Sequence, residues 1–275
     1  DLNLGTTTQA EVNYHWYQGL LGAKQHMLDN PANTDSEAVV GDIPSQALVG
    51  DTPPASNYPI NYFRVGYDVD GNIVSSNPHT EFFFTDPISY KSPVGATDNA
   101  SKKYHGTTQT AWLKARVVGS TATFRPIMSN KKIYKNIGAD NGDTYGQYTT
   151  ERDDLLAHFN TNGVKCAPWL VGDRHTPCVM SATVAGGAAA DVLCVCASPV
   201  GVVNNSDNTN MTYSAFHTWI AKAAGGQSLA VFGLGIVEQD RLTLQIRNAA
   251  NNGVVWEAYM TPGSNAVNYP TTKFG

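Results

Sequence analysis

Histidine and cysteine side chains lie close together in one part of the chain, and they suggest metal chemistry first. His175 and Cys178, followed by Cys194 and Cys196, could supply one nitrogen and three sulfurs to a zinc ion. The spacing is not that of a known zinc knuckle or ribbon, so buried, reduced thiols are the favoured interpretation, with Cys166 as the fourth. Cys194 and Cys196 lie two apart in an apolar strand, which makes a disulfide between them geometrically poor. The sequence therefore predicts no metal, no cofactor and a protein assembled in the cytoplasm.

A second group of possible ligands is Asp68-Val69-Asp70-Gly71-Asn72, which resembles the start of a calcium loop. The position of the closing glutamate is occupied by His79, so the motif fails. Asp-Gly is a preferred pair for a two-residue type I′ turn. The same residues therefore predict a β-hairpin, with one strand at 62–69 and its return at 72–74.

Motifs of common enzymes are absent from the sequence. There is no Gly-x-Ser-x-Gly, no His-Glu-x-x-His, and no glycine pattern for nucleotide phosphates. The glutamates show no pairing that suggests glycoside hydrolysis, although such pairs are rarely local in sequence. The sequence predicts that the protein is not an enzyme.

The composition of the chain excludes some classes of binding partner. Charged residues make up 15% of the 275 residues, below the roughly 25% usual in soluble domains, and the net charge is -5. This balance argues against nucleic acid as a partner. No apolar run approaches the ~18 residues that span a bilayer, so no membrane insertion is expected. The chain opens at Asp1 without an initiator methionine, and we expect it to be a piece of a longer protein.

The pattern of apolar residues and turns predicts a mainly β fold. Alternation and turn residues favour an antiparallel barrel or sandwich with two or three short helices and possibly two subdomains. Strands are expected at 81–85, 112–118, 120–128 and 191–197, a second hairpin at 241–247 with 254–260, and helices at 150–162 and 213–224.

A loop rich in Gly, Asn and Asp, at 136–148, is the expected recognition site. Tyr145 and Tyr148 could stack on a sugar ring, beside side chains that hydrogen-bond its hydroxyls. Substitutions there should then weaken binding without changing the melting temperature. The predicted receptor- or glycan-binding residues are Asp140, Asn141, Asp143, Tyr145 and Tyr148.

Two segments, Tyr58–Pro78 and Asp191–Val267, resemble the protruding domain of calicivirus capsid proteins. The first carries the Asp-Gly hairpin, and the second a strand, a variable loop, a short helix and a strand pair joined by an Asn/Gly turn. The resemblance implies a dimeric spike that binds a host-cell receptor or glycan. It also implies a lower β subdomain at 58–86 and 185–275 and an inserted upper subdomain at 87–184. Residues 1–57, rich in Pro, Asp and Gly over 30–54, are expected to form an N-terminal arm or wrapped segment, which departs from the pattern of that family.

The leading hypothesis is thus a viral capsid surface domain in the virion, assembled in the host cytoplasm. Its partners would be itself, as a homodimer or larger capsid assembly, and the host receptor or glycan. One alternative is a jelly-roll shell subunit of a picorna-like virus, or a phage receptor-binding protein. A further alternative, of another class, is a carbohydrate-active enzyme or lectin.

Overall fold

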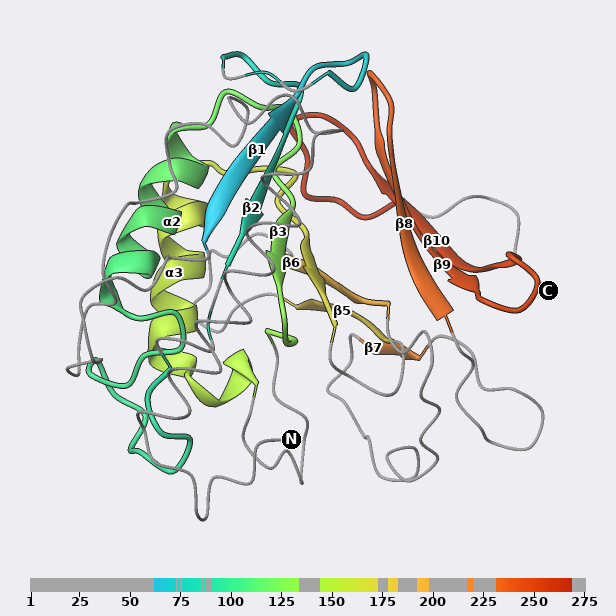
Figure 1. The fold of residues 1–275 in the computed structure, drawn as a ribbon. Coiled ribbons are helices and arrows are strands. Elements are labelled where there is room, and N and C mark those ends of the chain that lie inside the picture. The colour runs from blue at the N-terminus through green and yellow to red at the C-terminus, as the bar shows by residue number, and fades with distance from the viewer. Residues whose placement is uncertain are drawn as a thin grey trace, which may run out of the picture.

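The structure is a computed structural model that describes residues 62–72, 74, 76–85, 87, 91–133, 144–172, 178–182, 192–197, 217–219 and 231–268. These residues form three layers (Figure 1): a pair of helices, a large mixed sheet, and a small antiparallel sheet. The large sheet lies between the other two layers, so its central strands are covered on both faces.

Among the described residues, the large sheet has seven strands in the order β1-β2-β3-β4-β6-β5-β7. Strands β2, β3, β4 and β6 are parallel neighbours, whereas β1, β5 and β7 pair antiparallel. The bounds are β1 Phe63–Tyr67, β2 Thr80–Phe84, β3 Ile127–Ser129, β4 Trp169–Val171, β5 Cys178–Ala182, β6 Val192–Cys196 and β7 His217–Trp219.

The small sheet consists, in the described part of the chain, of β8 (Val231–Val237), β9 (Leu242–Asn248) and β10 (Val254–Met260) in the order β10-β9-β8. The predicted second hairpin is confirmed, because β9 pairs antiparallel with β10. Asn252 adopts φ 58° in the connecting turn, a conformation that asparagine tolerates better than most residues.

Two helices cover the same face of the large sheet (Figure 1): α2 (Thr107–Gly119) and α3 (Thr149–Thr161). The predicted helix at 150–162 is confirmed as α3, which buries Leu155, Leu156 and Phe159. It ends at Thr161, and Gly163, two residues further on, has a φ of 66° that favours glycine. A short 3-10 helix, η2 (Tyr145–Gln147), precedes it.

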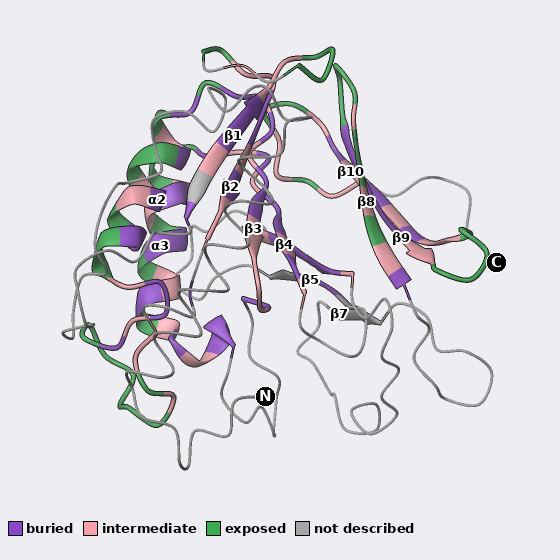
Figure 2. Cartoon of the chain, viewed as in Figure 1, coloured by how far each residue is buried: buried purple, intermediate pink, exposed green. Residues whose placement is uncertain are grey.

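The large sheet separates two hydrophobic clusters (Figure 2). Strand β6 contributes to both, since Cys194 and Cys196 face the helices while Leu193 and Val195 face the small sheet. The predicted strand at 191–197 is confirmed as β6. The buried thiols are confirmed for the described cysteine side chains, Cys166, Cys194 and Cys196, which are buried and form no disulfide. A strand buried on both faces is the usual situation in a parallel sheet.

The prediction of a mainly β, antiparallel barrel or sandwich is wrong. The structure is a mixed α/β fold, because four parallel strands form the middle of the large sheet and two helices pack on it. Strands β3 and β4 have only three residues each, too few for an alternating pattern to appear in the sequence. The chain between parallel strands must cross over, and α2 and α3 lie in two of these crossovers.

Two further element predictions are wrong. The strand expected at 112–118 lies in α2, whose buried residues Thr110, Leu113 and Val117 are spaced by three and four as a helix requires. Val117 and Val118 are β-branched and favour a strand, but the segment is helical because its buried side packs on the large sheet. Within the helix expected at 213–224, the structure describes only 217–219, which is strand β7.

The first predicted hairpin has a different second strand. A turn is present at Asp68–Gly71, with Gly71 at φ 82°, but Asp70 lacks the positive φ that the predicted type I′ turn requires. In addition, β1 pairs with β2 rather than with residues 72–74. A hydrogen bond from Val74 N to Gly66 O is the described link of that segment to β1. The large sheet draws its strands from 58–86, 87–184 and 185–275 alike, while residues 1–57 lie outside the described part.

Candidate functional site

The candidate site is the edge of the large sheet where the parallel strands end. Open α/β sheets bind ligands beyond the carboxyl ends of their strands. Here β2 leads to Thr85, β3 to Asn130 and β4 to Gly172, all within the described residues. Since β2, β3 and β4 are parallel neighbours, these three positions share one edge.

Asn130 is the described polar side chain best placed at this edge. Its Oδ1 accepts a hydrogen bond from Tyr104 Oη at 3.3 Å. That contact orients the amide, so that Nδ2 is the group left to donate to a ligand. Asn130 is partly exposed, so a ligand can reach it.

Two lysines, Lys102 and Lys132, are connected to η2 by hydrogen bonds. Lys132 follows β3, and its carbonyl accepts a hydrogen bond from Tyr145 N at 3.2 Å. On the other side of η2, Lys102 Nζ donates to Val94 O at 2.8 Å and Gln147 O at 3.0 Å, and lies 4.6 Å from the centre of the Tyr148 ring. Both lysines are almost fully buried, so each brings a positive charge into the protein near η2.

A buried histidine lies behind the edge. His105 is fully buried, 4.7 Å from the Tyr145 ring centre and 6.0 Å from that of Trp169. Neither of its ring nitrogens has a hydrogen-bond partner among the described residues. Desolvation lowers the pKa of His105 to about 3, so its ring is neutral at ordinary pH. The neutral imidazole of His105 therefore contributes to packing and is not accessible to a substrate.

Glu151 holds the backbone of His105 in place. This buried carboxylate accepts hydrogen bonds from Tyr104 N at 2.5 Å, His105 N at 3.2 Å and Thr110 Oγ1 at 2.6 Å. Burial raises the pKa of Glu151, although the three donors act in the opposite direction. The carboxylate thereby ties α3 to the start of α2, beside the candidate site.

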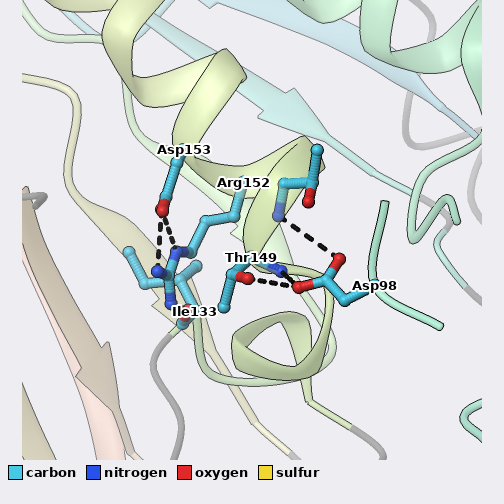
Figure 3. Close-up of polar contacts among 6 residues, drawn as sticks. Asp98, Ile133, Thr149, Arg152 and Asp153 are labelled. Carbon is cyan, nitrogen blue, oxygen red and sulfur yellow. Dashed lines mark hydrogen bonds and ion pairs between the residues drawn. The ribbon is translucent and has the colours of Figure 1, made fainter. Parts of the chain in front are cut away.

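The N-terminus of α3 is closed by a side chain from another loop (Figure 3). Asp98 accepts hydrogen bonds from Thr149 N at 2.9 Å, from the Thr149 hydroxyl, and from Thr150 N. On the other side of this turn, Arg152 bonds Asp153 and the carbonyl of Ile133. A helix N-terminus attracts anions, but this one already holds a carboxylate. We therefore exclude it as a binding place for a ligand.

Replacing Asp98 tests this cap. Asp98→Ala should lower the free energy of unfolding by about 1 kcal/mol in urea melts, the usual effect of losing a capping side chain. Asp98→Asn keeps an acceptor oxygen and should lose less. Burial alone would raise the pKa of Asp98, but hydrogen bonds from Thr149 and Thr150 hold it below its ordinary value. The contribution should therefore be present above the ordinary aspartate pKa and be lost as pH falls through the lowered one. Equal stability of Asp98→Ala and the unchanged protein would contradict the cap.

The residues predicted as a receptor or glycan site divide into two groups. Tyr145 and Tyr148 are fully buried, with the Tyr145 ring stacked on Tyr104 at 4.8 Å and Tyr148 Oη donating to Ser92 O at 2.7 Å. Neither ring is therefore exposed to stack on a sugar. Asp140, Asn141 and Asp143 lie outside the described residues.

Sequence reasoning missed Asn130, His105 and Glu151. One pattern could have indicated the edge: a short apolar run that ends in a polar residue. It occurs at Ile127-Met128 before Ser129-Asn130, at Phe82-Phe83-Phe84 before Thr85-Asp86, and at Trp169-Leu170-Val171 before Gly172-Asp173. Nothing local marks His105 or Glu151, because their burial comes from helix packing on a sheet.

No protein-family model matches the chain, and no curated protein matches it. Among solved structures, the chain is similar to one entitled "Structure of PhoD", with a TM-score of 0.56 and 13% identity over 81% of this chain and 45% of that one. GAP50, the anchor in the inner membrane complex of Plasmodium, gives 0.48 and 16% over 78% and 60%. Purple acid phosphatase PPD1 from yellow lupin (Lupinus luteus) gives 0.44 and 9% over 82% and 38%. We draw on the PhoD likeness alone, which shows the fold, and this chain spans about half the length of that protein.

The PhoD likeness corrects the functional hypothesis. The resemblance to a calicivirus protruding domain is wrong, because the chain has the mixed α/β fold of PhoD instead of that of a capsid spike. With it go the roles in the virion, in a capsid and in host attachment, and the assignment to a virion. The expectation of a non-enzyme rested on absent local motifs and on that resemblance. It is contradicted together with the resemblance, because the fold is that of PhoD.

Within the described residues, no helix is long and apolar enough to cross a membrane.

Proposed function

We propose that the chain is a phosphoester hydrolase whose substrate phosphate binds at the carboxyl edge of β2, β3 and β4. The observation that carries this proposal is the fold shared with PhoD, an alkaline phosphatase, over 81% of the chain. The edge itself adds Asn130 as a hydrogen-bond donor, with two buried lysines, Lys102 and Lys132, near η2. Positive charge and oriented donors are what a phosphate and its transition state need.

Metal ions are the cofactor that a metallophosphoesterase-like fold implies. The described residues do not fit them, because they contain no group of three or more His, Cys, Asp or Glu that could hold an ion. At the edge they offer the Asn130 amide, a group that can donate to an anion. In the sequence, Asp86 comes two residues after β2, and Asp173 and His175 come two and four residues after β4, all three outside the described residues. We therefore derive no step through a metal ion.

The proposed contribution of the described residues is binding and charge stabilisation. Asn130 Nδ2 would donate to a phosphate oxygen, while the Tyr104 hydroxyl keeps the amide from turning. The buried lysines would lower the electrostatic cost of bringing a doubly charged phosphate to the edge. Asp173 and His175, whose side-chain types serve in proton transfer, are the candidates for acid-base chemistry.

The test is hydrolysis of p-nitrophenyl phosphate and bis-p-nitrophenyl phosphate by the purified chain, with and without added divalent metal ions. Asn130→Ala should lower kcat/KM roughly 10- to 100-fold, as expected for one hydrogen bond to a charged group, worth about 1.5–3 kcal/mol. Asp173→Asn and His175→Gln should lower kcat. Asn162→Ala, on the exposed turn after α3, is the matched control and should leave the rate unchanged.

Two results would overturn the proposal. One is the absence of hydrolysis of either ester under every metal condition, in a sample whose melting curve shows it folded. The other is hydrolysis that survives Asn130→Ala, Asp173→Asn and His175→Gln alike, since the activity would then come from elsewhere in the molecule or from a contaminant.

A further inference from the structure

Strand β8 has an open edge in the described part of the chain, where its one strand neighbour is β9. All seven of its residues are apolar or glycine, Val-Phe-Gly-Leu-Gly-Ile-Val, and no charge interrupts them. Gly233, Gly235 and Ile236 are exposed, with Ile236 at 38%. Figure 2 shows exposed stretches along β8. Edge strands in monomeric proteins usually carry a charge, a proline or a bulge that prevents pairing with another chain. β8 carries none of these.

The two faces of β8 differ. Val231 lies in the cluster between the sheets, and a Cβ added at Gly233 would come within 2.8 Å of Ala197 Cβ, so the odd-numbered residues face inward. Side chains alternate along a strand, so the even-numbered residues face outward. The outer face of β8 is therefore a row of three large apolar side chains, Phe232, Leu234 and Ile236.

The backbone groups alternate in the same way. Glu238 N donates to Arg241 O at 2.8 Å, which makes this pair a hydrogen-bonded one at the β8–β9 turn. In an antiparallel ladder, hydrogen-bonded pairs alternate with pairs that are not. The even-numbered residues of β8 therefore bond to β9. The N–H and C=O groups of Val231, Gly233, Gly235 and Val237 point to the open edge.

The strand is also complementary to itself. If two copies of β8 pair antiparallel about a two-fold axis at Leu234, then Gly233 meets Gly235, Phe232 meets Ile236, and Val231 meets Val237. Leu234 meets the Leu234 of the other copy. Outward residues meet outward residues, as cross-strand pairing requires, and the residues that meet match in size and polarity. An interface of this kind, with the same patch on both subunits, is what a two-fold dimer needs.

From these observations we propose that β8 is a self-association site, at which two copies of the chain join their small sheets into one continuous sheet. The main chain supplies the hydrogen bonds, and the outward apolar residues supply the contact. The site is separate from the phosphate edge of the large sheet, so the proposal does not rest on the proposed function.

The experiment is analytical ultracentrifugation of the whole chain over a range of concentrations. A monomer–dimer equilibrium is expected. Leu234→Lys and Leu234→Glu should each weaken dimerisation about tenfold or more, because a leucine contact is lost and like charges meet at the axis. Mixing the two variants should restore a dimer, now a heterodimer with opposite charges at the axis. Circular dichroism melts show whether each variant is folded.

Cysteine crosslinking tests the register independently. Leu234→Cys should form an intermolecular disulfide under mild oxidation, because position 234 meets itself at a close, non-hydrogen-bonded pair. Ile236→Cys should crosslink much less, because it meets Phe232, and the unchanged chain is the control for the native thiols. A monomer at all concentrations overturns the proposal. So does a dimer that both charged variants leave intact, since another partner surface would then be at work. Equal crosslinking at 234 and 236 excludes the register.

Discussion

Replacing His105 by phenylalanine should remove a large part of the acid sensitivity of this protein. The ring is fully buried, and desolvation holds the pKa of His105 at about 3. In the unfolded chain the same group titrates near 6.5. Because the folded-state pKa is depressed, the neutral ring contributes its stability above pH 6.5, and that stability is lost as pH falls toward 3. The loss is about 2 kcal/mol at pH 5 and about 4 kcal/mol at pH 3.5.

At pH 7 the same variant should be as stable as the unchanged protein or more stable. Both ring nitrogens of His105 are buried without a partner among the described residues, and such groups cost free energy that an apolar ring does not. His105→Leu serves as a second variant should the larger phenylalanine crowd its neighbours. The measurement is the free energy of unfolding in urea at pH 7 and at pH 5, for each variant and the unchanged protein.

The pKa of Glu151 is shifted in the opposite sense to that of His105 on the stability–pH curve. The contributions of the two residues to the pH dependence of stability can therefore be distinguished. Burial raises its folded-state pKa, so its contribution is present at low pH and is lost as pH rises through that pKa. Glu151 therefore cannot produce a loss on acidification. His158→Gln, on the partly exposed side of α3, is the matched control and should keep the acid sensitivity. The same pH dependence in His105→Phe and the unchanged protein would show that His105 is not the buried neutral group described here.

The fold was predictable from the sequence where an element is long and its partner is near. The β9–β10 hairpin has strong alternation and an Asn/Gly turn, and α3 has both an apolar face and a glycine stop. In contrast, β3 and β4 are three residues long and gain their stability from neighbours far away, as in the register that places Ile127 beside Trp169 and Trp169 beside Cys194. A short stretch of sequence does not contain those contacts. For the same reason, residues 112–118, which lie in α2, were predicted to be a strand.

The candidate site was less predictable for the same reason. Tyr145 and Tyr148 stand among Gly, Asp and Gln, which is the composition of an exposed loop. Their burial comes from Tyr104, His105 and Trp169, which other parts of the chain bring to them. Residue types thus identified the aromatic groups but assigned them to the surface. The position of Asn130 follows only when β3 is known to end there in a parallel sheet.

Substitution of Tyr145 distinguishes an exposed ring from a buried one, and it should have a large effect on stability. If the ring lay on a surface, Tyr145→Ala would leave the melting temperature nearly unchanged. The structure places it at 0% exposure between Tyr104, His105 and Trp169, so we expect truncation to cost about 3–5 kcal/mol. For a chain of this size such a loss lowers the melting temperature by on the order of 10 °C.

Tyr145→Phe separates packing from hydrogen bonding at the same position. The Tyr145 hydroxyl is buried and has no hydrogen-bond partner among the described residues, so its removal should be neutral or slightly stabilising. Trp256→Ala, in the cluster between the two sheets, should be about as destabilising as Tyr145→Ala, whereas Val69→Ala, at 54% exposure, should change the free energy by less than about 0.5 kcal/mol. Thermal melts of the four variants decide the matter. If the melting temperature of Tyr145→Ala is close to that of Val69→Ala instead of that of Trp256→Ala, the Tyr145 ring is exposed. The packing of Tyr145 against Tyr104, His105 and Trp169 would then be wrong.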